Sequence, residues 1–218
     1  MSQPSTSARS PLRTVLLAVI AVGLVLLGGA LAVALGIGRG PAVPTADSVD
    51  VGFSRDMARH HLQGVEMANL AQDRSEDPAV RGLAFDIATT QTNQVGRMQG
   101  WLALWGYSPT GGDVMGWMGT SGHSGHGAGD STLMPGMATE EELANLRSLQ
   151  GTAFDVEFLR LMMRHHQGGL EMADYAAEHG ETDVVRRLAR TIAESQTAET
   201  RLMSGMLEER GGTPLPAP

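Results

Sequence analysis

Two stretches of the chain carry the same pattern of histidine and methionine. Each has two adjacent histidines, with a methionine three residues before the first of them and another seven residues after it. Imidazole and thioether groups together are ligands for soft, late first-row metals, and thioethers favour Cu(I) over hard ions. The sequence therefore predicts a Cu(I) site, with zinc as an alternative that the histidines alone would satisfy. The eight candidate ligands are Met57, His60, His61, Met67, Met162, His165, His166 and Met172.

The four candidates of each stretch fall on one face of a helix. At about 100° per residue their side chains span an arc of about 120°, which also contains Gly64 or Gly169. Two such helices would present the same face to each other. The alternative is a structural core in which methionine fills space and each buried histidine finds a protein partner. Four imidazoles near one axis without a ligand would suffer desolvation and repulsion, which favours metal binding.

Other polar residues of the repeat do not extend this ligand set. Glu66 and Glu171 lie about 120° around the helix from the histidine faces, so they belong to another surface. A carboxylate-bridged di-iron bundle would need Glu-x-x-His on two helices, and the chain lacks that pattern. Gln91 and Gln196 interrupt apolar stripes, where each would either orient a histidine or bridge helices. Hydrolase triads and phosphate-binding glycine loops are absent from the sequence, so we expect a binding protein and no catalytic residues.

A glycine-rich segment, residues 107–138, holds a second group of candidate ligands. The spacings Met-x-x-Met and His-x-x-His allow chelation by a flexible strip, whereas a glycine and serine linker with incidental methionine is the alternative. The auxiliary candidates are Met115, Met118, His123, His126, Met134 and Met137.

The two stretches belong to an internal repeat with a constant offset. Residues 53–102 align without a gap on residues 158–207, with 23 identities over 50 positions. Apolar and small residues recur at helical spacing, and each copy predicts two helices joined by a turn. Two matching hairpins predict an all-α domain, built as an antiparallel four-helix bundle with pseudo-twofold symmetry.

Local signals predict where the helices begin and end. Asp77, followed by proline, predicts a helix start, and Gly106 predicts the end of that helix. Thr139 and Glu142 have the spacing of a capping box, so another helix should begin there, with a break near Gly151.

Composition narrows the classes of partner. The chain has no cysteine, which excludes disulfides, iron–sulfur clusters and thiolate metal sites. From Asp47 onward it has 13 arginines against 24 acidic residues, a net charge of −11. Nucleic-acid binding needs a basic surface, so a cation is the more natural partner.

Residues 14–38 form an uncharged, mostly apolar run of 25 residues, longer than the roughly 20 that cross a bilayer as a helix. We expect a transmembrane signal anchor, because a cleavable signal peptide usually has only about 7–15 apolar residues. Cleavage near Ala30, with secretion, is the alternative. Arg9 and Arg13 precede the run, so the positive-inside tendency predicts a single-pass protein of the cell membrane, with residues 1–13 cytoplasmic and the domain extracytoplasmic.

The predicted organisation after the anchor is a linker, a domain and a tail. The linker is 39–47, the four-helix domain 48–210 and the tail 211–218; within the domain, repeat 1 is 48–106, the loop 107–138 and repeat 2 139–210.

The motif MPGM, followed by FDVEFLRLMMRHHQGGLEMA, and RHHLQGVEMA in the first copy resemble the bacterial family known as domain of unknown function 305. The resemblance covers about residues 48–210. It implies a ferritin-like four-helix fold, and some members are similar to periplasmic copper-binding proteins that use methionine and histidine. It also implies that the eight residues of the two faces are the ligands. Leu62 and Gln63 stand where the second copy has Gln167 and Gly168, so the halves are not strictly equivalent.

The expected function is therefore that of a membrane-anchored, extracytoplasmic protein that sequesters or transfers Cu(I). The alternatives are a non-metal structural or adaptor domain with a polar His/Met core, and a ferritin-like redox enzyme. The expected partners are a metal ion and the membrane, and the sequence names no protein partner.

Overall fold

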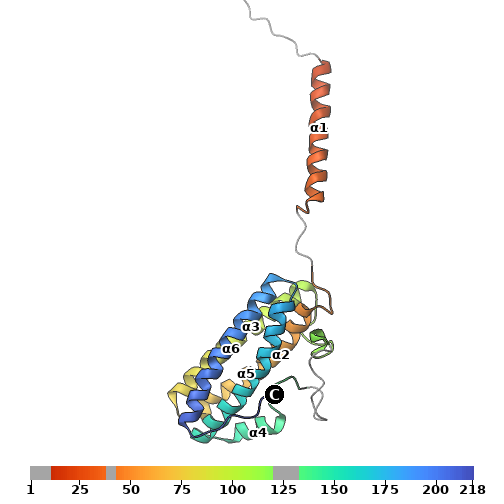
Figure 1. Cartoon of the computed structure of the whole chain (residues 1–218). Coiled ribbons are helices and arrows are strands. Elements are labelled where there is room, and N and C mark those ends of the chain that lie inside the picture. The colour runs from red at the N-terminus through yellow and green to blue at the C-terminus, as the bar shows by residue number, and fades with distance from the viewer. Residues whose placement is uncertain (1–10, 38–42, 120–132) are drawn as a thin grey trace, which may run out of the picture. The chain divides into compact units, whose positions relative to one another are not determined.

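The computed structural model describes residues 11–37, 43–119 and 133–218 (Figure 1). These residues contain six α-helices, one 3-10 turn and no strand. The prediction of an all-α chain is thus confirmed for the described part. Contacts divide the chain into two compact units, residues 1–43 and 44–218.

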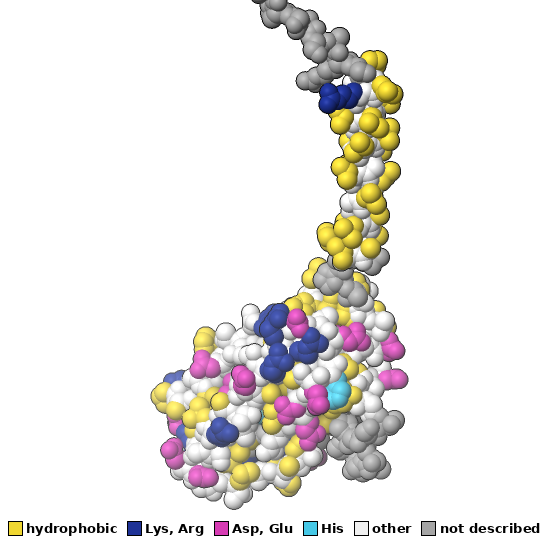
Figure 2. Space-filling view, turned by 45° about the horizontal axis from the view of Figure 1, so that its top comes forward, with side chains coloured by type: hydrophobic (Ala, Val, Ile, Leu, Met, Phe, Trp, Pro, Cys, Tyr) yellow, Lys and Arg dark blue, Asp and Glu magenta, His cyan; other side chains and the backbone are white. Residues whose placement is uncertain are grey.

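Helix α1, Pro11–Ala34, makes up most of the first unit, and none of its side chains is buried. Figure 2 shows its surface covered by hydrophobic side chains. Its length and composition are sufficient to cross a membrane, and an N-terminal signal sequence has the same properties. The helix ends in a Schellman motif, in which Gly36 has a φ of 70° and the Ile37 amide donates to Ala32 O at 2.8 Å.

Two long helical hairpins make up most of the second unit. Asp77 caps the helix that begins at Pro78, because its carboxylate accepts from Ala79 N at 2.8 Å. Thr139 and Glu142 form the predicted capping box. A break at Gly151 separates a short helix from the long one that follows, as predicted. The elements are α2 (Val49–Arg74), α3 (Pro78–Trp105), η1 (Gly116–Met118), α4 (Glu140–Ser148), α5 (Gly151–His179) and α6 (Asp183–Glu209).

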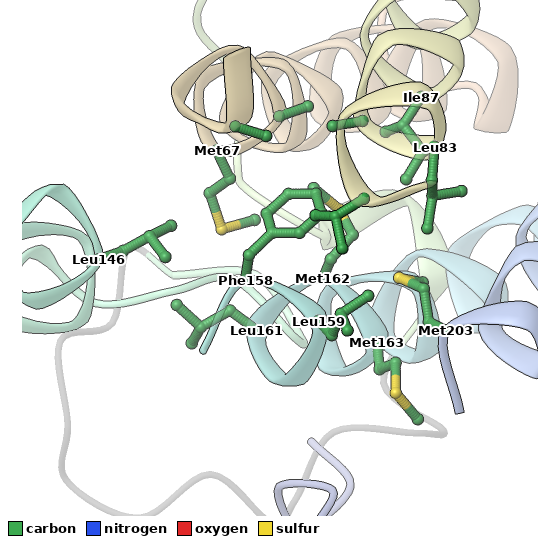
Figure 3. Packing of buried hydrophobic residues seen from close by; sticks show 14 of the residues in the cluster. Met67, Leu83, Ile87, Leu146, Phe158, Leu159, Leu161, Met162, Met163 and Met203 are labelled. Atoms are coloured by element: carbon green, nitrogen blue, oxygen red, sulfur yellow. The ribbon is translucent and has the colours of Figure 1, made fainter. Parts of the chain in front are cut away.

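The hairpins are α2 with α3 and α5 with α6, and they meet along α2 and α5. Two apolar clusters fill the interior. The Phe158 cluster, which includes Met67, Phe158 and Met162, joins the end of α2 to the start of α5 (Figure 3). The Phe53 cluster, which includes Phe53 and Met172, joins the start of α2 to the end of α5. The two helices therefore run antiparallel, as the repeat predicts.

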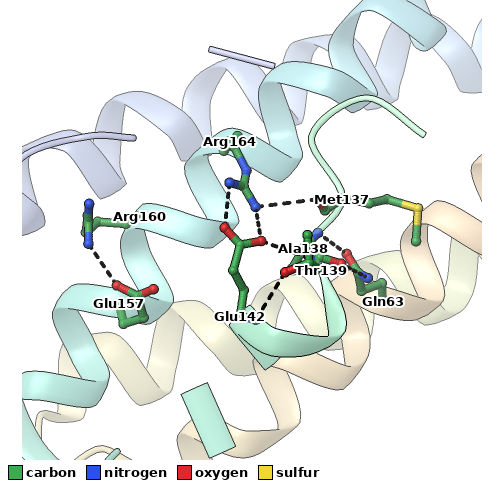
Figure 4. A network of polar contacts seen from close by, with 8 residues as sticks. All are labelled: Gln63, Met137, Ala138, Thr139, Glu142, Glu157, Arg160 and Arg164. Atoms are coloured by element: carbon green, nitrogen blue, oxygen red, sulfur yellow. Dashed lines mark hydrogen bonds and ion pairs between the residues drawn. The ribbon is translucent and has the colours of Figure 1, made fainter. Parts of the chain in front are cut away.

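The segment that leads into α4 is held against α2 and α5 by polar contacts (Figure 4). The Gln63 amide donates to Ala138 O at 2.9 Å and accepts from Ala138 N at 2.7 Å. Arg164 donates from both terminal nitrogens to the Glu142 carboxylate at 2.8 and 2.6 Å. These contacts fix the preceding residues over the middle of the two facing helices.

Candidate metal centre

Four histidines form a buried layer between the two apolar clusters. His60 and His61 lie on α2 and His165 and His166 on α5, and none of them has exposed surface. The rings of His60 and His165 have centroids 3.8 Å apart and planes inclined by 32°. Each lies 6.4 or 6.3 Å from the ring of its neighbour on the same helix. We call these four residues the His layer; it brings both predicted histidine pairs together.

The two central histidines bond to backbone carbonyls. His60 donates from Nε2 to Pro135 O at 3.1 Å, and His165 donates from Nε2 to His60 O at 3.0 Å. Because a carbonyl oxygen only accepts, these bonds place the proton of each ring on Nε2.

The two outer histidines bond to side chains of the neighbouring helices, and sequence reasoning missed both partners. His61 donates from Nε2 to Gln94 Oε1 at 2.7 Å, and His166 Nε2 lies 2.6 Å from Glu199 Oε2. Each partner follows its histidine by 33 residues, so the two contacts are equivalent in the repeat. That shared spacing of a polar residue was the available signal.

The opposite nitrogen of every ring is left without a partner. All four Nδ1 atoms are buried and accept no hydrogen bond within the described residues. With the proton on Nε2, Nδ1 of a neutral imidazole carries the lone pair that binds a metal. A hydrogen bond from the other ring nitrogen to carbonyl or carboxylate is the usual companion of a metal-bound histidine. The His layer thus has the chemistry of a ligand set.

Burial keeps three of these rings neutral. Desolvation lowers the pKa of His60 from its ordinary value of 6.5 to about 4. Desolvation, together with repulsion from His60, lowers the pKa of His61 to about 3. The pKa of His165 is lowered well below its ordinary value for the same reasons. A metal at neutral pH would therefore not have to displace protons from these three rings.

Two glycines give the central rings their room. A Cβ atom on Gly64 of α2 would lie 3.0 Å from Cε1 of His165, and one on Gly169 of α5 would lie 3.2 Å from Cε1 of His60. Both contacts are tighter than ordinary packing allows, so a larger residue would displace the imidazole of the facing helix. The repeated glycines thus permit the close crossing that stacks the two rings.

Two glutamine amides complete the layer. Oε1 of Gln91 lies 2.3 Å from the position of a Cβ on Gly64, and both amide atoms of Gln196 lie 2.9 Å from that of Gly169. Both amides are buried, and neither has a hydrogen-bond partner within the described residues. They neither orient a histidine nor bridge helices by a hydrogen bond, which were the two expectations, and they add unpaired polar atoms to the layer.

The predicted methionines divide between the two sides of the His layer. Met57 and Met172 belong to the Phe53 cluster, Met67 and Met162 belong to the Phe158 cluster, and all four are fully buried. Met57 and Met67 are separated by ten residues of helix, or about 15 Å. One ion cannot contact both, so the eight candidates do not form one ligand set. They form a histidine layer with a methionine pair on each side.

Four of the auxiliary candidates pack against the folded domain. Met134 is 2% exposed and belongs to the Phe53 cluster. Three others are partly buried against that cluster: Met115, Met118 and Met137. The predicted ligands His123 and His126 lie outside the described residues.

The MPGM motif explains why the halves differ. Pro135 O lies 2.0 Å from the position that a Cβ on Gly168 would take, so this backbone packs directly on α5. Gly136 adopts a φ of 78°, which favours glycine. The equivalent of Gly168 in the first copy is Gln63, whose amide holds Ala138 instead. The second copy therefore receives the loop that supplies the carbonyl partner of His60.

The predicted repeat carboxylates, Glu66 and Glu171, do not add ligands to the His layer. In the described part of the chain, no three His, Cys, Asp or Glu side chains are grouped as a metal site, and this includes the four histidines of the His layer. Glu66 is 44% exposed and pairs with Arg147 on α4, and Glu171 is exposed. A pocket of about 300 Å³ at the start of α2, lined by Asp47 and Trp117, contains none of the candidate ligands. A metal here would need thioether as well as imidazole donors.

The sequence profile of the family described as "Domain of unknown function (DUF305)" matches residues 50–207. The chain belongs to the DUF305 family. A DUF305 crystal structure from Streptomyces coelicolor is 45% identical, with a TM-score of 0.72 over 79% of this chain and 99% of that one. A DUF305 fragment from Deinococcus radiodurans is 34% identical, with a TM-score of 0.62 over 78% and 99%.

The copper protein CopM is a more distant neighbour of this DUF305 chain. Its Cu(I)-bound form is 26% identical, with a TM-score of 0.57 over 73% of this chain and 96% of that one. Its Cu(II)-bound form is 28% identical, with the same TM-score over 74% and 97%. No curated protein sequence matches the chain. The family resemblance expected from the repeated HH-x-x-G-x-E-M-A pattern is confirmed.

Proposed function

We propose that this DUF305 protein is a membrane-anchored, extracytoplasmic copper-binding protein that holds Cu(I) at the His layer, for sequestration or transfer. One observation carries the proposal: within the described residues, all four imidazoles have a partner at Nε2 and none at Nδ1. A buried polar atom without a partner is unfavourable by about 1–3 kcal/mol. A ligand that the fold is built to receive would account for four such atoms in one buried layer.

Cu(I) fits the donors better than a hard or doubly charged ion. Imidazole and thioether are neutral, and placing a single positive charge in a water-free core is less unfavourable than placing two. The Glu199 carboxylate behind His166 would offset that charge through the imidazole. The likeness to CopM, solved with Cu(I) and Cu(II), supports copper as the metal.

The methionine pairs would complete the coordination from each side of the layer. Met57 and Met162 each precede the first histidine of their helix by three residues, so each lies one turn away on the same face. Because the helices cross antiparallel, Met172 lies with Met57 in the Phe53 cluster. Met67 lies with Met162 in the Phe158 cluster. The repeat would thus offer two related half-sites, one with Met57 and Met172 and one with Met67 and Met162, in the ferritin-like four-helix arrangement that we propose, and we infer a binding role without a catalytic reaction.

The location follows from α1. Its apolar length would anchor the chain, and the arginines before it would keep the N-terminus in the cytoplasm. The acidic domain would then face the outside, where it would meet copper ions. Carbonate extraction of membranes tests this part separately, since an anchored chain stays with the lipid.

The metal is tested by an anaerobic Cu(I) titration of residues 44–218 against a chromophoric chelator, beside Zn(II). This piece is a compact unit, and the crystallised Streptomyces relative matches 79% of this chain over 99% of its own length. The H60A/H165A double variant should lose at least about 100-fold in Cu(I) affinity, because two central donors are removed. The control is H179A, which changes an exposed histidine outside the layer.

Two other results of the titration would contradict copper binding at the His layer. Uptake with unchanged affinity in the double variant would contradict a site at His60 and His165 and would move it to the loop methionines and histidines. No uptake of either metal would refute the proposal and leave a structural or adaptor domain with a polar core.

A further inference from the structure

The ends of α3 and α6 are equivalent in the repeat but differ in chemistry. Both helices end in a Schellman motif, at Gly106 with a φ of 81° and at Gly211 with a φ of 67°. Around these glycines the first copy is aromatic and apolar, whereas the second is charged. The corresponding pairs are Trp101 and Met206, Leu104 and Glu209, Trp105 and Arg210, and Tyr107 and Gly212.

This end of α3 leaves apolar surface open to solvent. Leu104 is 81% exposed, and Trp101 and Trp105 are partly exposed, with ring centroids 6.3 Å apart. Residues 87–112 contain no acidic side chain, although the chain from Asp47 onward carries a net charge of −11. Their one charge is Arg97, whose guanidinium lies 5.5 Å from the Trp101 ring centroid. An exposed apolar patch of this kind marks an interaction surface.

The patch lies where the domain receives the chain that comes from α1. The Tyr107 hydroxyl donates to Pro44 O at 3.0 Å, which ties the start of the domain to the end of α3. Six peptide links join Ile37 to Val43, and they span at most about 22 Å. The apolar helix and the aromatic patch are therefore joined by a short stretch of chain.

We propose that the end of α3, formed by Trp101, Leu104, Trp105 and Tyr107, lies in the headgroup region of the bilayer that α1 spans. This inference rests on the anchor in the proposed function. Tryptophan and tyrosine favour the membrane interface because the ring is apolar and its N–H or O–H reaches water or headgroups. The lack of acidic residues avoids repulsion from anionic lipids.

Acidic residues at the same end of the domain would restrict the membrane contact to the side formed by the end of α3. The turn between α5 and α6 lies at the same end, because the Asp50 carboxylate on α2 accepts from Glu181 N at 2.6 Å. That turn carries Glu181 and Asp183, which a lipid surface would not favour. The contact would limit rotation of the domain about its tether.

Tryptophan quenching in the full chain tests the contact, because only three tryptophans are present and Trp117 is buried, with 8% exposure. The chain is reconstituted in vesicles whose lipids are brominated near the glycerol backbone. The W117F variant, which keeps the patch, should lose about half of its emission in brominated vesicles, as expected for interfacial indoles. The W101F/W105F variant keeps only the buried indole and should lose little.

A matched variant exchanges the chemistry of the two helix ends. L104E/W105R in the W117F background gives α3 the residues that end α6, and the quenching of Trp101 should disappear with unchanged circular dichroism. Cu(I) uptake, measured separately, should also be unchanged, because none of these residues belongs to the His layer.

The outcomes separate the contact from the anchor. A chain that floats with the vesicles but shows no quenching in W117F overturns the contact alone. Shielded but unquenched tryptophans, together with self-association in sedimentation, would overturn it in favour of a second copy. A chain that does not float refutes the anchor and the contact together, while the copper titration stands independently.

Discussion

Acid should destabilise the domain because three rings of the His layer, those of His60, His61 and His165, exclude protons. The pKa of His60 is lowered to about 4 and that of His61 to about 3, while both titrate near 6.5 in an unfolded chain. Between these values the unfolded state binds protons and the folded state does not. The two rings therefore contribute stability that is fully present above about pH 6.5 and is lost as the pH falls toward the folded pKa values.

The size of the effect follows from the pKa difference. At pH 5 the pH lies about 1.5 units below the pKa of each ring in the unfolded chain, whereas both rings are still neutral in the folded domain. At about 1.4 kcal/mol per unit, each ring therefore lowers the free energy of unfolding by about 2 kcal/mol. The pair should thus lower the free energy of unfolding by about 4 kcal/mol between pH 7.5 and pH 5. The lowered pKa of His165 acts in the same direction. A small domain has only about 5–15 kcal/mol in total.

Urea unfolding of residues 44–218 at pH 7.5, 6 and 5 measures this directly. From about pH 7.5 to pH 5 the free energy of unfolding of the H61Q variant should fall by about 2 kcal/mol less than that of the wild type, because the variant lacks one ring that is protonated only when unfolded. H179Q, an exposed control, should follow the wild type. Carboxylates with a lowered pKa, such as Glu142, are present in every variant, so their effect cancels. Parallel curves for H61Q and the wild type would refute a neutral, proton-excluding His61.

Three further changes test the surroundings of the layer. G169A should cost about 1–3 kcal/mol by overpacking, whereas G82A, whose Cβ meets nothing, should stabilise by about 0.5–1 kcal/mol; equal urea midpoints would contradict the close crossing. E199Q should weaken Cu(I) binding about 10-fold in chelator competition, because the carboxylate behind the ring is lost; an unchanged affinity would show that the carboxylate has no such role. D56A removes the acceptor that lies 2.8 Å from Trp117 Nε1, and the free energy of unfolding should fall by about 1–3 kcal/mol; an unchanged melting curve would speak against that anchor of the loop.

The helices and their facing surfaces could be predicted from the sequence because both depend on local patterns. The caps at Asp77 and Thr139 require only neighbouring residues, and the structure contains both as expected. The repeat predicted two hairpins with matching faces, since an identical pattern at an identical spacing folds in the same way. The histidines could be singled out because burying a polar side chain on an apolar helix face is unfavourable unless that side chain has a partner.

The pairing of the methionines across the two helices could not be predicted, because it depends on how α2 and α5 cross. An antiparallel crossing centred between Gly64 and Gly169 pairs Met57 with Met172 and Met67 with Met162, whereas a parallel crossing would pair Met57 with Met162. The carbonyl of Pro135 was equally hidden, since its approach depends on a loop that returns from 75 residues away. These are contacts between distant segments, for which periodicity carries no signal.

Copper K-edge X-ray absorption of residues 44–218, loaded anaerobically with one equivalent of Cu(I), tests the central claim most directly. The account predicts a first shell that contains both imidazole nitrogen and thioether sulfur, with the imidazole signal reduced in H60A/H165A and unchanged in H179A. A shell of sulfur alone or of oxygen, or an imidazole signal that is unchanged in the double variant, would contradict a copper site at the His layer.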